Sequence, residues 1–282
     1  MDGQTREEIA GMLLGAYASR IPVEPLTEKY AGKYAGKYAD EDAALTLEDA
    51  YEIQLLQVRE WLSAGARIKG HKVGLTSAAM QRQMGVDQPD YGHLLDSMFW
   101  LENEPIPASR FLQPRVEPEI AFVLARELRG PGVTVADAIG AVGFVLPALE
   151  LIDSRIRDWR IKLLDTIADN ASSAGVVLGS VPVPLAATDL RLAGCNLHKN
   201  GEVAGTGAGG AVLGSPLTAL VWLANTLGER GIVLQPGQVI LPGSVTAAIP
   251  VGAGDTVTAT FAGLGSVTAR FTGEAGNQEE DK

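Results

Sequence analysis

The chain has 282 residues, 46% hydrophobic and 20% charged, a composition typical of a globular protein that can bury a sizeable core. Its formal net charge of −11 argues against nucleic acid and anionic membranes as partners. Cys195 is the only cysteine, which excludes an intrachain disulfide and a thiolate metal cluster. Acidic residues precede the first apolar run, and no apolar stretch approaches the length of a membrane span, so we expect a soluble cytoplasmic protein.

Residues 1–66 are predicted to form an N-terminal helical region. Apolar residues recur at helical spacing over Ile9–Tyr17, which predicts a first amphipathic helix. Thr46 and Asp49 have the spacing of a capping box, which predicts the start of a second helix. Between the two helices, a Lys-Tyr-Ala-Gly unit repeats over residues 29–40, and we assign this repeat to a loop without a chemical role.

Residues 67–272 are predicted to form a catalytic region of strands and glycine turns. A strand is expected around Lys72, while the composition of Gln88–Gly92 predicts a turn that would place Asp90 in a loop. The later elements are expected in this order: a helix over 133–141, a strand over 144–152, an irregular polar segment over 165–173, a strand over 175–179, a hairpin at Asn200–Gly201, a helix opened by Ser215–Pro216, and strands over 239–244, 255–261 and 265–271. Residues 273–282 are acidic and poor in apolar side chains, which predicts a disordered tail.

The most informative stretch is the strand predicted at Arg115–Leu124, which is rich in Val, Ile and Phe. On a period of two, Glu117 and Glu119 share one face, and both faces continue as apolar, so we expect a central strand. Pro118 cannot donate to a ladder, which indicates an edge or a bulge. Two carboxylates about 7 Å apart along a strand can bend toward one hard cation; the alternative is an exposed rim where both face water.

Glu150 favours the metal interpretation because it ends an apolar run from Ala138 to Leu149. The alternative is a residue at a strand end that turns to solvent. Three carboxylates in apolar settings, in a chain with 3 histidines and 1 cysteine, favour an all-oxygen site for Mg²⁺ or Mn²⁺. Further along, Arg155 is expected to pair with Asp153.

Several separated motifs occur together in a fixed order: Lys72-Val73-Gly74-Leu75-Thr76-Ser77, Pro89-Asp90-Tyr91-Gly92, Arg115-Val116-Glu117-Pro118-Glu119, Ala148-Leu149-Glu150 and Ala168-Asp169-Asn170-Ala171-Ser172. This combination resembles the hydratase/decarboxylase family of aromatic meta-cleavage pathways, inside the fumarylacetoacetate hydrolase superfamily. The likeness runs from about Ile9 to Phe271.

The resemblance implies an α+β fold, with a mixed β-sheet roll of the fumarylacetoacetate hydrolase C-terminal type behind the helical region. It implies a homo-oligomer, and leaves open an association with other enzymes of the pathway. The implied residue roles are these: one Mg²⁺ or Mn²⁺ on Glu117, Glu119 and Glu150, catalytic roles near the reacting carbons for Lys72 and Asp90, and substrate contacts for Ser172 and Ser244. Without the resemblance, a structural ion pair is the simpler interpretation of Lys72 and Asp90.

The implied substrate is a small 2-oxo or 2-hydroxydienoic acid, and the expected reaction is hydration of 2-hydroxypenta-2,4-dienoate or an alkyl homologue to a 4-hydroxy-2-oxo acid. The stretch from Ile156 to Ser172 looks more like the hydratase branch than the decarboxylase branch. A 2-oxohex-3-enedioate decarboxylase is the first alternative; it needs a cation for a second carboxylate, for which Arg157 and Arg160 are the candidates. A catalytically silent metal-binding relative is the second alternative, which three intact acidic residues argue against.

Overall fold

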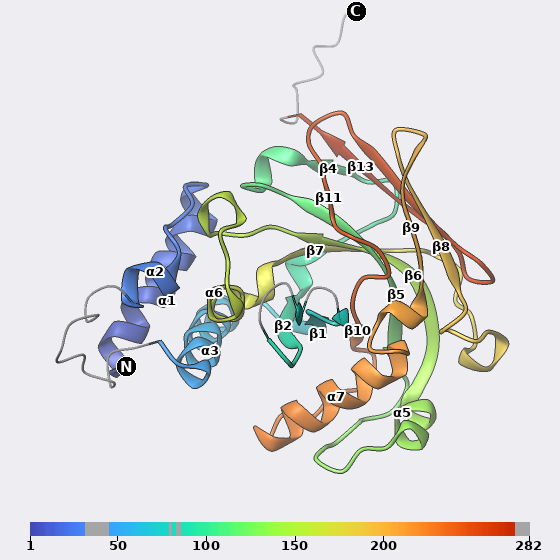
Figure 1. Ribbon diagram of the computed structural model, residues 1–282, viewed down its shortest axis with the longest axis horizontal. Helices are drawn as coiled ribbons and strands as arrows, with labels where there is room; N and C mark the ends of the chain where they lie inside the picture. The colour runs from blue at the N-terminus through green and yellow to red at the C-terminus, as the bar shows by residue number, and fades with distance from the viewer. Residues whose placement is uncertain (32–44, 79–80, 83–85, 274–282) are drawn as a thin grey trace, which may run out of the picture.

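The computed structural model describes residues 1–31, 45–78, 81–82 and 86–273 (Figure 1). Both predicted N-terminal helices are present: α1 spans Gly3–Ser19 and α3 spans Leu47–Ser63, with a short α2 over Leu26–Ala31 between them. The Thr46–Asp49 capping box is formed, because each side chain accepts a hydrogen bond from the other residue's backbone N–H. Most of the Lys-Tyr repeat, and the predicted tail beyond residue 273, lie outside the described residues.

The larger sheet is mixed and has eight strands in the order β2-β1-β10-β5-β6-β7-β3, with β11 also paired to β5. β1 pairs with β10 in parallel and β3 with β7 in parallel, whereas the other pairs are antiparallel. Its strands are β1 (Ile68–Gly74), β2 (Asp90–Leu95), β3 (Phe99–Trp100), β5 (Arg115–Leu124), β6 (Val142–Ile152), β7 (Ser173–Leu178), β10 (Val239–Leu241) and β11 (Ile249–Pro250). The predicted acidic strand is therefore β5, and it is central as expected.

The smaller sheet has five strands in the order β4-β13-β12-β8-β9 and packs against β6 and β7 of the larger sheet (Figure 1). Its strands are β4 (Pro105–Pro107), β8 (Gly194–Lys199), β9 (Glu202–Ala208), β12 (Thr256–Phe261) and β13 (Gly265–Thr272). The predicted hairpin is confirmed: β8 and β9 are joined by Asn200 and Gly201, which both have positive φ, 53° and 86°.

Two further helices, α5 (Val135–Ala141) and α7 (Pro216–Glu229), pack against each other, and a third, α6 (Leu163–Ala168), packs against α3. Short 3₁₀ turns occur at Asp96–Met98, Ala108–Arg110, Arg157–Trp159, Asn170–Ser172, Leu185–Ala187 and Gly209–Ala211. Residues 165–173, predicted to be irregular, thus begin as the helix α6, and only their second half is a tight turn.

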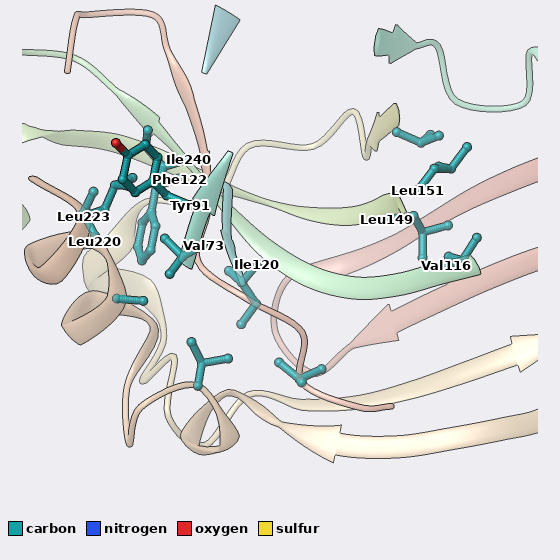
Figure 2. Packing of buried hydrophobic residues seen from close by; sticks show 14 of the residues in the cluster. Val73, Tyr91, Val116, Ile120, Phe122, Leu149, Leu151, Leu220, Leu223 and Ile240 are labelled. Atoms are coloured by element: carbon teal, nitrogen blue, oxygen red, sulfur yellow. The ribbon is translucent and has the colours of Figure 1, made fainter. Parts of the chain in front are cut away.

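The larger of two hydrophobic clusters lies on one face of the large sheet, and a smaller one, which includes Ala121 and Leu146, lies on the other. Figure 2 shows Tyr91 and Phe122 beside Leu220 and Leu223 of α7, with Val116 toward the other end of β5. On a period of two, Val116 and Phe122 point to the face opposite Glu117 and Glu119. The larger cluster therefore packs against one face of β5, while Glu117 and Glu119 share the other face with the smaller cluster.

One described stretch, Gly209–Glu229, is long and apolar enough to cross a membrane by length and composition alone. It is not one continuous helix, because Leu213 and Gly214 have positive φ before α7 begins. The 14 residues of α7 span about 21 Å, less than the roughly 30 Å of a bilayer core. Its leucine stripe is buried in the protein, which identifies α7 as a core helix.

Candidate active site

Three glutamates from neighbouring strands meet on one face of the large sheet. Glu117 of β5 lies directly opposite Glu150 of β6, so both side chains point the same way. Glu119 lies two residues further along β5 and shares that face. One carboxylate oxygen from each of the three lies within 4.8 Å of the others. Glu119 and Glu150 are fully buried and Glu117 is partly buried, so the exposed-rim and strand-end alternatives are wrong.

Burial and mutual repulsion make this cluster unstable as three free anions. Burial, with the neighbouring Glu150 next, raises the pKa of Glu117 to about 7. The same two causes raise the pKa of Glu119 well above its ordinary value, and burial raises that of Glu150. Among the described residues, Oε1 of Glu119 and Oε2 of Glu150 have no hydrogen-bond partner, and Oε1 of Glu150 has only the Lys72 ammonium, at 3.4 Å. Buried, mutually repelling oxygens with so few donors fit a hard divalent cation.

The ladder on the other side of β5 is interrupted next to this cluster. On the side of β5 away from β6, β10 pairs with Val123 and Phe122, and β11 pairs with Val116 and Arg115. Pro118 lies between these two pairings, so its missing N–H leaves no ladder hydrogen bond unmade on this side of β5. It therefore marks a gap between two partner strands and not a sheet edge; the bulge against β6 occurs elsewhere, at Val123/Leu124.

The loop between β10 and β11 crosses this gap and donates a hydrogen bond to one of the glutamates. The N–H of Gly243 donates to Oε2 of Glu119 at 2.8 Å, and the N–H of Val245 donates to the Pro118 carbonyl at 3.1 Å. Gly243 has a φ of 121°, and a Cβ there would lie 2.0 Å from Oγ1 of Thr76. Only glycine allows this approach.

Lys72 of β1 supplies a buried ammonium beside the cluster. Its Nζ lies 3.4 Å from Oε1 of Glu150 and donates to the carbonyl of Ala171 at 3.0 Å. Burial alone would lower the pKa of Lys72, but the surrounding carboxylates, Glu150 foremost, outweigh it and raise the pKa above its ordinary value. Lys72 is thus a stable cation in the metal-free site.

Asp90 occupies a different position from the one predicted. It is not in a loop: it is the first residue of β2, opposite Gly74 of β1, and is buried. Burial raises its pKa, while Lys72 opposes the shift. A Cβ on Gly74 would lie 2.1 Å from Oδ1 of Asp90 and 3.4 Å from Nζ of Lys72. The Asp90 carboxylate and the Lys72 ammonium therefore both lie next to Gly74. Among the described ion pairs, Lys72 is joined to Glu150 and not to Asp90, so the simple Lys72–Asp90 ion pair is wrong.

The two predicted substrate-contacting serines differ in their surroundings. Ser172 is buried, and its Oγ has no hydrogen-bond partner in the described part of the chain. Ser172 directly follows Ala171, whose carbonyl binds Lys72, which puts it beside the ammonium. Ser244 follows Gly243 and so lies beside Glu119, but its hydroxyl already donates to the Thr246 carbonyl at 2.8 Å.

The sequence interpretation missed how the segment around Ser172 is held. Arg155 was expected to pair with Asp153, but it forms a fully buried ion pair with Asp169 instead. Asp153 accepts hydrogen bonds from the backbone N–H groups of Leu112 and Gln113, at 2.9 and 2.7 Å. No local pattern distinguishes the two aspartates, since the pairing joins residues 14 positions apart in different elements.

Residues 70–272 match the family described as fumarylacetoacetate (FAA) hydrolase C-terminal, and the chain belongs to that family. The predicted superfamily and the predicted fold, a mixed-sheet roll behind a helical N-terminal region, are confirmed.

Within the family, the chain is similar to named hydratases. It is 43% identical over 271 residues to a 2-keto-4-pentenoate hydratase of Paraburkholderia xenovorans (strain LB400), covering 96% of each chain. It is 44% identical over 233 residues to a 2-oxo-hept-4-ene-1,7-dioate hydratase of Escherichia coli, covering 80% of this chain and 87% of that one. A solved 4-oxalocrotonate decarboxylase from Pseudomonas putida G7, complexed with magnesium and adipate, superposes with a TM-score of 0.89 at 36% identity, covering 96% and 98% of the two chains.

Proposed function

We propose that the chain is a divalent-metal-dependent hydro-lyase that adds water to 2-hydroxypenta-2,4-dienoate or an alkyl homologue, giving a 4-hydroxy-2-oxo acid. The observation that carries the proposal is the buried cluster of Glu117, Glu119 and Glu150 with the Lys72 ammonium beside it. The relatives named as hydratases, at 43% and 44% identity, support the choice of reaction.

The proposed cation is Mg²⁺ or Mn²⁺, held by Glu117, Glu119 and Glu150. The solved decarboxylase is complexed with magnesium, and a second structure of it with calcium, which supports a hard divalent ion for the family. When bound, such a cation supplies Lewis-acid stabilisation of negative charge on the carboxylate and C2 oxygen of a 2-oxo acid. It would also relieve the repulsion that raises the pKa of Glu117 and of Glu119.

The proposed reaction consists of a ketonisation followed by an addition of water. The dienol is protonated at C5 and loses its O–H proton, giving the 3-enoate with a ketone at C2. Water then adds at C4 and gives up one proton, and C3 of the resulting enolate takes up one proton. Lys72 and Asp90 are the proposed acid/base pair, because both border the same point over Gly74 and both are buried. Ser172 has a free buried hydroxyl to offer the substrate, and Ser244 is proposed to assist in binding it.

The decarboxylase alternative needs a free cation for the far carboxylate of its substrate. Both candidates named for that role are already engaged: Arg157 and Arg160 bind the two carboxylate oxygens of Glu24 on the surface, at 2.6 and 2.5 Å. This favours a substrate without a far carboxylate. The silent-relative alternative is disfavoured because Lys72 and Asp90 accompany the three glutamates in one site.

The test is to offer the dienoate and 2-oxohex-3-enedioate separately to purified, Mg²⁺-loaded protein, following loss of dienol absorbance and release of CO₂. We expect hydration of the dienoate without CO₂ release. Rapid CO₂ release from the diacid with an untouched dienoate would establish the decarboxylase, and inactivity on both would support the silent relative.

The biological setting proposed with this reaction is the meta-cleavage catabolism of aromatic compounds in the cytoplasm. The −11 charge supports a small-molecule substrate and disfavours nucleic acid and membranes as partners. We also propose a homo-oligomer, with association to other enzymes of the pathway left open; light scattering on the purified protein tests the assembly state.

A further inference from the structure

Three consecutive residues beside the site adopt an unusual backbone conformation. Asn170, Ala171 and Ser172 have φ values of 50°, 51° and 55°, and none of them is glycine. L-residues enter this left-handed region at a cost, and a run of three persists only where the surroundings enforce it. The contacts that enforce this turn therefore determine where its carbonyls and side chains lie.

This turn carries two groups that matter for the site. The Ala171 carbonyl accepts the hydrogen bond from Nζ of Lys72, and Oγ of the next residue, Ser172, is buried with no hydrogen-bond partner in the part of the chain that the structure describes. The turn also lies against β2: a Cβ on Gly92 would come within 2.5 Å of the Asn170 carbonyl oxygen and 2.7 Å of Oγ of Ser173. A small displacement of the turn would thus move the acceptor of Lys72 and the Ser172 hydroxyl together.

Arg155 holds the turn at both of its ends. Its Nη2 donates to the Asp169 carbonyl at 2.7 Å, and its Nη1 donates to the Ser173 carbonyl at 3.3 Å. Its Nε and backbone N–H donate to the two carboxylate oxygens of Asp169. The side chain of Asn170 adds one more anchor, because it accepts from the N–H of His93 and donates to the His93 carbonyl.

We propose that Arg155 is a positioning residue for the reaction, because its guanidinium joins the two ends of the left-handed turn and so fixes the Ala171 carbonyl against Lys72 and the Ser172 hydroxyl in the site. This role rests on the proposed function. Arg155 itself contacts none of the three glutamates through a described hydrogen bond or ion pair, so it acts through the turn. A planar fork that reaches two carbonyls and a carboxylate is specific to arginine.

A cavity beside Arg155 makes this role accessible to chemical rescue. It has a volume of about 240 Å³ and is lined by Arg155 together with Tyr17, Trp61 and Met98 among others. None of the three glutamates, nor Lys72, lines it. Arg155→Ala removes the atoms of an ethylguanidinium ion from one wall, so that ion can enter from the cavity and occupy the vacated place.

The experiment compares Arg155→Ala, with and without ethylguanidinium, with wild type and with Arg191→Ala. Arg191 is a matched control because its side chain is 62% exposed and binds Asp189 on the surface, and we expect wild-type kcat in that variant. For Arg155→Ala we expect kcat to fall about a hundredfold, KM to change by less than about threefold, and Mn²⁺ affinity at the glutamates to stay at the wild-type value. Ethylguanidinium should restore kcat at least about tenfold, whereas urea should not.

Hydrogen exchange of the peptide that covers Asp169–Ser173 gives a readout independent of turnover. Exchange should be faster in Arg155→Ala and slower again with ethylguanidinium, even if the wild type proves inactive on every dienoate, which would refute the proposed function alone. If Arg155→Ala does not fold, Arg155→Lys replaces it; it keeps the charge but not the fork, and should show the same kcat loss at unchanged metal affinity. Wild-type kcat in the folded variant, or a loss that ethylguanidinium leaves untouched in both readouts, would overturn the positioning role.

Discussion

Replacing Glu119 by glutamine separates the electrostatic cost of the glutamate cluster from its use in binding a cation. The side chain is fully buried and accepts one hydrogen bond, from the Gly243 N–H at 2.8 Å, which the carbonyl oxygen of glutamine can also accept. The substitution therefore keeps shape and hydrogen bond while removing one charge. In the metal-free protein that charge is unfavourable, because burial and the neighbouring glutamates raise the pKa of Glu119 well above its ordinary value.

The sign of the pH dependence follows from the raised pKa. A buried carboxyl keeps its proton in the folded state after the unfolded chain has lost it, so its contribution to stability is complete below an unfolded pKa of about 4.3 and declines as pH rises toward the folded value. The decline is about 1.4 kcal/mol per pH unit for each such group. For Glu117, whose pKa rises from 4.5 to about 7, it amounts to about 3 kcal/mol as an upper value, since that side chain keeps some contact with water.

We expect the free energy of unfolding of metal-free Glu119→Gln to be closest to that of the wild type at low pH, because the raised pKa of Glu119 favours its neutral form there. As pH rises, the variant should become the more stable of the two, because it has no charge to bury. Its Mn²⁺ affinity should fall by at least about a hundredfold. Urea unfolding in chelator at several pH values measures the first two, and calorimetric titration measures the third.

Glu127→Gln is the matched control, because the Glu127 side chain is 56% exposed and lies outside the cluster. It should leave both the pH slope of stability and the Mn²⁺ affinity unchanged. Equal pH slopes in the wild type and Glu119→Gln would show that Glu119 is not ionised at a cost in the folded state. Wild-type Mn²⁺ affinity in Glu119→Gln would show that Glu119 is not a ligand.

Three further outcomes are expected. Exhaustive chelation should abolish turnover, with Mg²⁺ or Mn²⁺ restoring it and Zn²⁺ serving poorly, because the site offers three carboxylates; full activity of the chelated protein would contradict this. Lys72→Ala and Asp90→Asn should each lower kcat by about a hundredfold or more while the folded protein still binds metal, and near-normal kcat in both would make the two residues structural. Gly74→Ala would place a methyl group 2.1 Å from Oδ1 of Asp90 and should also lower kcat, whereas Gly194→Ala, with nothing within 4 Å, should not; equal activity of the two variants would place Asp90 elsewhere.

Local patterns in the sequence predicted the elements whose causes are local. The Thr46–Asp49 capping box depends on residues three positions apart, and it formed as expected. The alternation around Glu117 and Glu119 gave the correct strand and the correct shared face, because side chains on a strand alternate whatever its neighbours are. The burial of Glu150 also followed from its apolar surroundings in the sequence.

The features that were missed depend on pairings distant in the chain. Asp90 has the sequence of a turn, but pairing with Gly74 makes it the first residue of a strand. The left-handed turn at Asn170–Ser172 contains no glycine, so the sequence gives no local signal for it. The hydrogen bonds that hold it come from Arg155 and from His93 of β2. Three-dimensional context overrode local preference at these positions, as is common where a site is assembled.

The break in the large sheet explains why the polar residues gather where they do. Along β5 the ladder with β6 runs from Arg115 to Leu124, whereas the other side loses its regular partner between the β10 and β11 pairings. Where a strand has no regular partner, its backbone groups can form hydrogen bonds with a loop. Here the Val245 N–H donates to the Pro118 carbonyl, and the Gly243 N–H donates to the Glu119 carboxylate. Proline suits the gap because it has no N–H to leave unpaired on a buried strand. The same interruption that removes ladder hydrogen bonds from β5 thus lets a backbone N–H, that of Gly243, reach the buried carboxylate of Glu119.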